Sequence, residues 1–107
     1  MTIEQARTAL RLADGLPQEI GWGRAFLQGG GPCDAVGHMA VALGWTDSVY
    51  VYKVEHSTGL SVKNIVDAND GASRVHRRVT VVREVERQVR EAGYDPQALR
   101  REVSPDA

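Results

Sequence analysis

The stretch SRVHRRVTVVREVERQVREAG, residues 73–93, decides the fold class because it is the longest element that the sequence predicts. Its valines recur at helical spacing, and at 100° per residue they cover an arc of about 160°. The stripe consists of Val75, Val79, Val82 and Val89, with Val81 and Val85 beside it. So wide an arc predicts contact with more than one neighbour, and a part left uncovered would indicate a dimer or partner site. In isolation, residues 79–82 also fit a short strand.

Two helices are predicted before this stretch. Thr2 and Gln5 have the spacing of a capping box at the start of an amphipathic helix that ends at Gly15. The run GGGP at residues 29–32 is a break, and a second helix over residues 33–43 should follow it. The small residues of that second helix would allow close approach by another helix, which predicts a central position.

The remaining segments also favour helices. Residues 48–57 fit a helix or a strand, and we favour a helix because no convincing second strand is available to pair with. Ser61 begins a short apolar helix that should end near Asn69-Asp70-Gly71, and Asp95 with Pro96 begins a final one. The sequence therefore predicts an all-α domain of four to six helices over residues 1–103, with residues 104–107 as a frayed tail. We expect the long helix of residues 73–92 to pack on the helix of residues 33–43.

Composition excludes several classes of protein. With 107 residues, net charge −1 and 42% hydrophobic residues, the chain fits one globular domain with one core. It has no apolar run long enough for a membrane span, and its first 13 residues lack a signal-peptide core. The single cysteine, Cys33, cannot form an intramolecular disulfide, which fits a reducing, cytoplasmic location.

No cofactor or metal site is predicted. The three histidines, His38, His56 and His76, are too widely spaced for a ligand set. Residues 67–71 resemble a calcium loop only superficially, because Gly71 falls where a ligand belongs. The glycine run at residues 29–31 lacks the lysine and hydroxyl residue of a phosphate-binding loop.

Cys33 supports one catalytic hypothesis, a thiol hydrolase. It lies at a predicted helix start, where backbone N–H groups and the helix dipole lower the pKa of a thiol. His56 would be its base, with Asp67 or Asn69 as the orienting group. The structural alternative, a small buried apolar side chain, is favoured because it is the commoner role of a single cysteine.

A basic cluster supports a second hypothesis, an anionic partner. Residues 74–83 contain four arginines and one histidine without an acid, and Arg74, Arg77 and Arg78 share one helix face. An isoelectric point near 6.3 argues against a general nucleic-acid surface. Solvated arginines, or ion pairs to Asp67 and Asp70, are therefore favoured over phosphate contacts.

Aromatic and polar residues complete the candidates. Tyr50 and Tyr52 are predicted partner contacts, because tyrosine and arginine are enriched in interface hot spots. Trp22 is predicted to fill the core. Asn69 and Asp70 are predicted to cap the long helix and so to serve structure.

Several short motifs carry a family resemblance. They are Gly21-Trp22-Gly23, Cys33-x-x-Val36-Gly37, Ala42-Leu43, Ile65-x-x-x-Asn69-Asp70, Val79 and Ala92, over about residues 20–93. In these the chain resembles a family of small actinobacterial and actinobacteriophage proteins classed as a domain of unknown function. The resemblance implies a mostly helical fold and an actinobacterial or phage source, and brings no activity with it. Within these motifs, Gly37, Asn69 and Asp70 are predicted to serve structure. Because the sequence shows no complete catalytic or metal constellation, we predict a small accessory protein, encoded by a phage, that binds a host protein or forms a homodimer. The thiol hydrolase and a nucleic-acid-binding protein are the alternatives.

Overall fold

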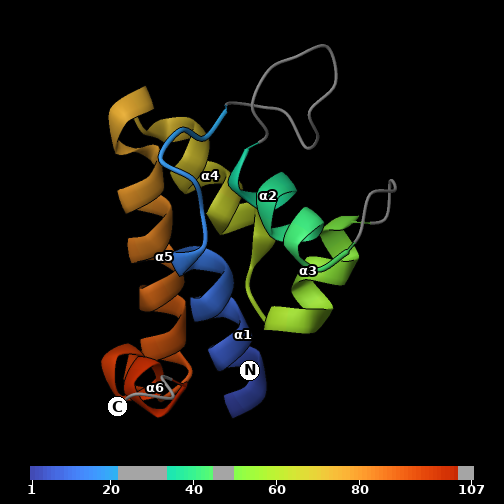
Figure 1. Ribbon diagram of the computed structural model, residues 1–107, viewed down its shortest axis with the longest axis vertical. Helices are drawn as coiled ribbons and strands as arrows, with labels where there is room; N and C mark the ends of the chain where they lie inside the picture. The colour runs from blue at the N-terminus through green and yellow to red at the C-terminus, as the bar shows by residue number, and fades with distance from the viewer. Residues whose placement is uncertain (22–33, 45–49, 104–107) are drawn as a thin grey trace.

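The computed structural model describes residues 1–21, 34–44 and 50–103 (Figure 1). Over these residues the chain is helical and contains no strand, which confirms the predicted all-α class. The elements are α1 (Ile3–Asp14), α2 (Ala35–Ala42), α3 (Tyr50–Thr58), α4 (Val62–Gly71), the 3₁₀ turn η1 (Arg74–His76), α5 (Arg77–Glu91) and α6 (Pro96–Val103). Both ambiguous segments, residues 50–56 and 79–82, are therefore helical.

The helix starts follow local sequence signals. At α1 the predicted capping box is present: Gln5 N donates to Thr2 Oγ1 at 3.1 Å, and Thr2 N donates to Gln5 Oε1 at 2.7 Å. Asp34 caps α2 by accepting the Gly37 N–H at 2.8 Å, and Ser61 caps α4. Before α6, Asp95 accepts the Gln97 N–H at 3.0 Å. The predicted starts of the first and last helices are therefore confirmed.

Helix α5 lies beside α1 and α4, while α2 and α3 lie on the other side of the molecule (Figure 1). It packs mainly on α4 and α1, whereas α2 packs on α3 and α4. The predicted packing of the long helix on residues 33–43 is therefore wrong. The reason is that α4 contacts both helices and takes the place beside α5 that the sequence analysis had assigned to α2.

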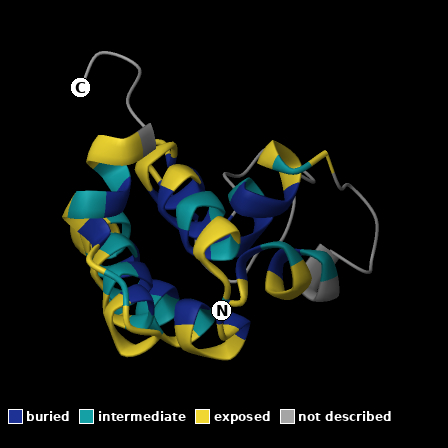
Figure 2. Cartoon of the chain, turned by 90° about the horizontal axis from the view of Figure 1, so that it is seen from below, coloured by how far each residue is buried: buried dark blue, intermediate teal, exposed yellow. Residues whose placement is uncertain are grey.

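The valine stripe of the long helix is only partly covered. Val81, Val85 and Val89 are fully buried, whereas Val75 is 82% exposed and Val79 is 39% exposed. Val79 lies about 120° around the helix from Val85, so it faces away from the neighbours that cover Val85. Figure 2 shows this division, with buried residues where helices face one another and exposed residues outside. Val75 and Val79 are therefore the part of the valine arc that the neighbouring helices leave uncovered.

Contacts between distant segments complete the fold. The Gln5 side chain donates to the backbone carbonyl of His56 at 2.9 Å and so joins α1 to α3. The largest fully buried side chains include Ile20, Met39 and Ile65. Among the residues described, no helix combines the length and apolar character that crossing a membrane requires.

Candidate protein-interaction surface

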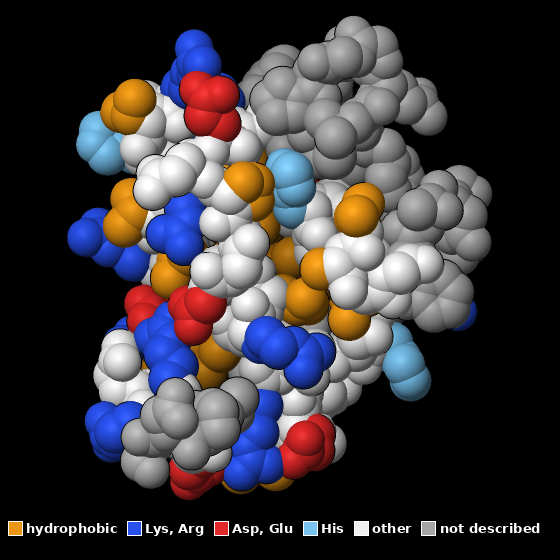
Figure 3. Space-filling view, viewed as in Figure 1, with side chains coloured by type: hydrophobic (Ala, Val, Ile, Leu, Met, Phe, Trp, Pro, Cys, Tyr) orange, Lys and Arg blue, Asp and Glu red, His pale blue; other side chains and the backbone are white. Residues whose placement is uncertain are grey.

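An exposed face of η1 and α5 combines apolar and basic side chains. We define the valine–arginine face as Val75, Val79, Arg83 and Arg90, all of which are exposed. At 100° per residue, Val79, Arg83 and Arg90 lie within about 40° of one another on α5. Figure 3 shows hydrophobic side chains among basic ones along the upper left edge, where η1 and α5 lie. The face therefore offers apolar contact and positive charge together.

The two arginines of this face have no carboxylate partner among the described residues. Glu86 and Arg90 have the four-residue spacing that favours an ion pair on a helix, but Glu86 is bound by Arg100 of α6, with Nη1 and Oε2 2.6 Å apart. The same guanidinium donates to both carboxylate oxygens of Asp14, at 2.9 and 2.8 Å. Arg90 is therefore left exposed, while the acid nearest to it on this side of α5 is neutralised. Arg87 and Glu91, which have the same spacing, do form an ion pair, at 2.7 Å.

The three arginines predicted to bind a partner contact the segment between α1 and residue 21. Arg77 donates to the Ile20 carbonyl at 3.1 Å, and Arg78 donates to the carbonyls of Leu16 at 2.9 Å and Asp14 at 3.2 Å. Backbone carbonyls carry no net charge, so these contacts leave both guanidinium charges uncompensated.

Arg74 forms an ion pair, but not with the acids expected from the sequence. Its partner is Glu19, and both side chains are largely exposed. Asp67 pairs instead with Lys63 at 3.1 Å, and Asp70 accepts a hydrogen bond from Asn69 at 2.9 Å. Acids that are close to Arg74 in sequence are thus engaged within their own helix.

Asn69 and Asp70 do not cap the long helix, so that prediction is wrong. The residues before η1 and α5, Ser73 and His76, make no side-chain cap hydrogen bond. Asn69 instead accepts the Ala35 N–H at 3.0 Å and donates to the Gly21 carbonyl at 3.0 Å. It lies on the last turn of α4, from which its side chain reaches the start of α2 rather than the next helix.

Asp34 lies at the same junction and has a perturbed acidity. Burial raises the pKa of the Asp34 carboxyl, and the nearby Asp70 carboxylate raises it further. The hydrogen bond from the Gly37 N–H opposes this shift. Gly37, for which a structural role was predicted, is buried and supplies this backbone donor.

The residues of the thiol-hydrolase hypothesis are not brought together by the described part of the chain. Cys33, Trp22 and the side chains of Tyr50 and Tyr52 lie outside the described residues. His56 is exposed on α3, and Asp67 lies on α4 in its ion pair with Lys63. Within the described ranges, no hydrogen bond joins the His56 ring to Asp67 or Asn69.

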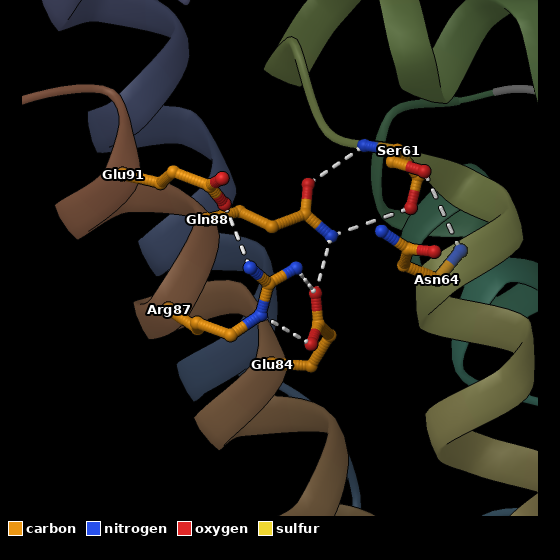
Figure 4. Close-up of polar contacts among 6 residues, drawn as sticks. All are labelled: Ser61, Asn64, Glu84, Arg87, Gln88 and Glu91. Carbon is orange, nitrogen blue, oxygen red and sulfur yellow. Dashed lines mark hydrogen bonds and ion pairs between the residues drawn. The ribbon is translucent and has the colours of Figure 1, made fainter.

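A shallow groove of about 260 Å³ lies between α4, α5 and the N-terminal residue. Figure 4 shows its polar wall, in which Gln88 Oε1 accepts the Ser61 N–H at 2.7 Å and Nε2 donates to Glu84 at 2.8 Å. Arg87 binds Glu84 through two hydrogen bonds, at 2.8 and 2.7 Å, and thereby lowers the pKa of that carboxyl. These side chains satisfy one another and tie α4 to α5, so the groove is a weaker candidate than the valine–arginine face.

Arg90 was not among the partner-binding residues predicted from the sequence, and the sequence did not show which of its valines are exposed. The available signal was the width of the valine arc, which exceeds what the neighbouring helices cover. In residues 1–21, 34–44 and 50–103, no three potential ligands form a metal-binding group. No family model matches the sequence, and no curated protein or solved structure is significantly similar to it.

Proposed function

We propose that this chain is a protein-binding module that contacts its partner through the valine–arginine face. The observation that carries the proposal is the exposure of Val75, at 82%, four residues from the exposed Val79. Of the remaining valines of α5, Val81, Val85 and Val89 are fully buried and Val82 is partly buried. Single exposed valines are common, but two on one helix face that is also lined by arginines have the composition of an interface.

A protein fits this face better than a nucleic acid does. Phosphates would neutralise Arg83 and Arg90 but would gain nothing from Val75 and Val79, whose burial is favourable only against apolar groups. An isoelectric point near 6.3 also differs from that of typical nucleic-acid-binding domains. Arginine stems contribute apolar area as well as charge, so they extend the contact that the valines begin.

The family resemblance supplies the biological setting of the proposal. A chain that resembles actinobacterial and phage proteins would act as a phage-encoded accessory protein in the host cytoplasm. Its partner would then be a host protein, and its role would be to bind that protein rather than to catalyse a reaction. A thiol hydrolase that uses Cys33, His56 and Asp67 remains the enzymatic alternative. No contact among its described residues supports it.

The test compares two matched sets of valine substitutions. Immobilised wild-type protein would be exposed to actinobacterial lysate, and any retained protein would be purified and titrated against the variants. We expect Val75→Ser with Val79→Ser to weaken this purified complex. Val41→Ser is the control, because Val41 is 50% exposed on α2, away from the face. Equal affinity of the double variant and the wild type would refute the proposal, as would the absence of any retained protein.

A further inference from the structure

We propose that the occupant of the valine–arginine face is an acidic amphipathic helix of the partner protein. This inference rests on the proposed function, since it specifies the chemistry of the segment that docks there. Its basis is the juxtaposition of Val75 and Val79 with arginines that have no carboxylate partner in the described part of the chain.

The spacing of the face suits a helix. Arg83 and Arg90 are seven residues apart on α5, which places them about 10 Å apart on the same side of the helix. Carboxylates two turns apart on a partner helix have the same separation and could meet both guanidinium groups. An apolar residue further along that helix would then contact Val75 and Val79, at the opposite end of the face.

The charged residues in and around the valine–arginine face favour an acidic partner. Residues 74–83 contain no acid, and Arg77 and Arg78 donate to neutral carbonyls. Glu86, the one acid on this side of α5, is already neutralised by Arg100. A partner with carboxylates would therefore meet the guanidinium groups of Arg83 and Arg90, which have no carboxylate partner among the described residues, and this favours both association rate and orientation.

The same charge distribution argues against a second copy of this chain. In a symmetric dimer the same patch of each protomer meets its counterpart, so Arg83 and Arg90 would face identical arginines. Glu86, the one acid on this side of α5, is held by Arg100 and does not offset this repulsion. The protein is therefore expected to be monomeric in solution when no partner is present.

The experiment uses synthetic helical peptides as probes. An 18-residue peptide, about 27 Å long as a helix, would carry a leucine stripe flanked by glutamates. A second peptide would carry lysines in place of the glutamates, and a third would have the acidic sequence scrambled. A single-stranded oligonucleotide would test the nucleic-acid alternative. Binding would be measured by fluorescence anisotropy at two salt concentrations.

Two double variants with the same change of net charge decide the outcome. Arg83→Glu with Arg90→Glu alters the face, whereas Arg11→Glu with Arg101→Glu alters exposed arginines of α1 and α6. We expect the acidic peptide to bind the wild type, to weaken about tenfold or more with the first variant, and to be unaffected by the second. Circular dichroism would establish that both variants are folded. The lysine peptide should show the reverse preference.

Several results would overturn the inference. They are equal binding of the acidic and scrambled peptides, equal loss in both variants, or tighter binding of the oligonucleotide than of the peptide. Failure of the inference is distinguishable from failure of the proposed function. If the purified partner is lost with Val75→Ser and Val79→Ser but not with the arginine reversals, the face binds protein and its occupant is not acidic.

Discussion

The side chain of Asn69 joins the start of α2 to the segment that follows α1. Its Oδ1 accepts the Ala35 N–H and its Nδ2 donates to the Gly21 carbonyl, each at 3.0 Å, and the residue is fully buried. Nδ2 also donates to Asp70 at 2.9 Å. An amide is the one uncharged side chain of this size that supplies both an acceptor and two donors, so neither aspartate nor leucine can replace it.

Removal of this carboxamide should strongly destabilise the protein. Asn69→Ala leaves the buried Ala35 N–H and Gly21 carbonyl without their partner, and we expect a loss of about 2–4 kcal/mol in the free energy of unfolding. Asn69→Asp retains the acceptor but loses the donors, and adds a charge near Asp34 and Asp70. Urea denaturation followed by circular dichroism would measure both losses.

Asn64 offers a matched control on the same helix. It is exposed and its side chain makes no hydrogen bond within the described ranges. Asn64→Ala should therefore change stability by no more than about 0.5 kcal/mol. Similar losses for Asn64→Ala and Asn69→Ala would contradict the bridging role of Asn69.

The raised pKa of the Asp34 carboxyl predicts an unusual dependence of stability on pH. Since burial raises the pKa of its carboxyl in the folded state, the folded protein binds the proton more tightly than the unfolded chain does. Stability from this group therefore rises as pH falls from the raised folded value toward about 3.9, the ordinary value for aspartate. Most structural carboxylates behave in the opposite way, because ion pairs lower their pKa.

Asp34→Asn tests this prediction because asparagine keeps the cap and removes the charge. We expect Asp34→Asn to be more stable than the wild type at pH 7, with a difference that shrinks as the pH is lowered. Asp34→Ala loses the cap on Gly37 and should be less stable by about 1 kcal/mol. The measurement is the free energy of unfolding between about pH 4 and pH 7. A difference between Asp34→Asn and the wild type that is constant with pH would contradict the raised pKa.

Arg100 should hold α6 to the rest of the fold. Its guanidinium binds Asp14 at the end of α1 and Glu86 in α5, and only 22% of its side chain is exposed. Arg100→Lys keeps the charge but loses the two-point contact with Asp14. Since 46% of the Asp14 side chain is exposed, solvent screens this pair, and we expect a loss of about 1 kcal/mol.

Arg101→Lys is the matched control, because Arg101 is exposed on α6 and has no ion pair among the described residues. Hydrogen exchange would locate the effect: amides of α6 should lose protection in Arg100→Lys and keep it in Arg101→Lys. Unchanged protection in both variants would show that apolar contacts such as that of the buried Leu99 hold α6 without the ion pairs.

Local signals in the sequence predicted the helices well. Three helix starts are fixed by contacts between residues that are close in sequence, so they can be predicted without knowledge of the fold. They are marked by Thr2 with Gln5, by Ser61, and by Asp95 with Pro96. Asp34 caps α2 in the same local way, by accepting the Gly37 N–H. The 3₁₀ turn at residues 74–76 was not predicted, since nothing in its composition distinguishes it from the first turn of the long helix.

Contacts between distant segments could not be predicted in the same way. Periodicity gave the width of the valine arc, but which part is covered depends on where α1 and α4 lie. The spacing of Glu86 and Arg90 suggested an ion pair, but Arg100 competes successfully because it comes from α6 and also reaches Asp14. The candidate face is therefore defined by the three-dimensional arrangement, which shows which valines are exposed and which arginines have no carboxylate partner among the described residues.

Substitution of three glycines by alanine would test how backbone conformation and nearby atoms at each position affect stability. Gly59 and Gly93 both have positive φ, at +68° and +97°, so Gly→Ala at either should cost about 1 kcal/mol from strain. A Cβ at Gly59 would also lie 3.2 Å from the Met1 Cα and 3.1 Å from Gln5 Oε1, whereas nothing lies within 4 Å at Gly93. Gly59→Ala should therefore be the more destabilising, because it must displace Met1 or the capping-box glutamine.

Gly71 is the glycine at which alanine should stabilise the protein instead of destabilising it. It ends α4 without a positive φ, and a Cβ there would meet no atom within 4 Å. Gly71→Ala should therefore stabilise the protein by about 0.4–1 kcal/mol, since alanine loses less conformational entropy on folding. Thermal unfolding of the three variants would give the order Gly71→Ala, Gly93→Ala, Gly59→Ala from highest to lowest midpoint. Equal midpoints for the last two would mean that Met1 and Gln5 yield to the added methyl group without cost, and that the contact of the N-terminal residue with Gly59 adds nothing to stability.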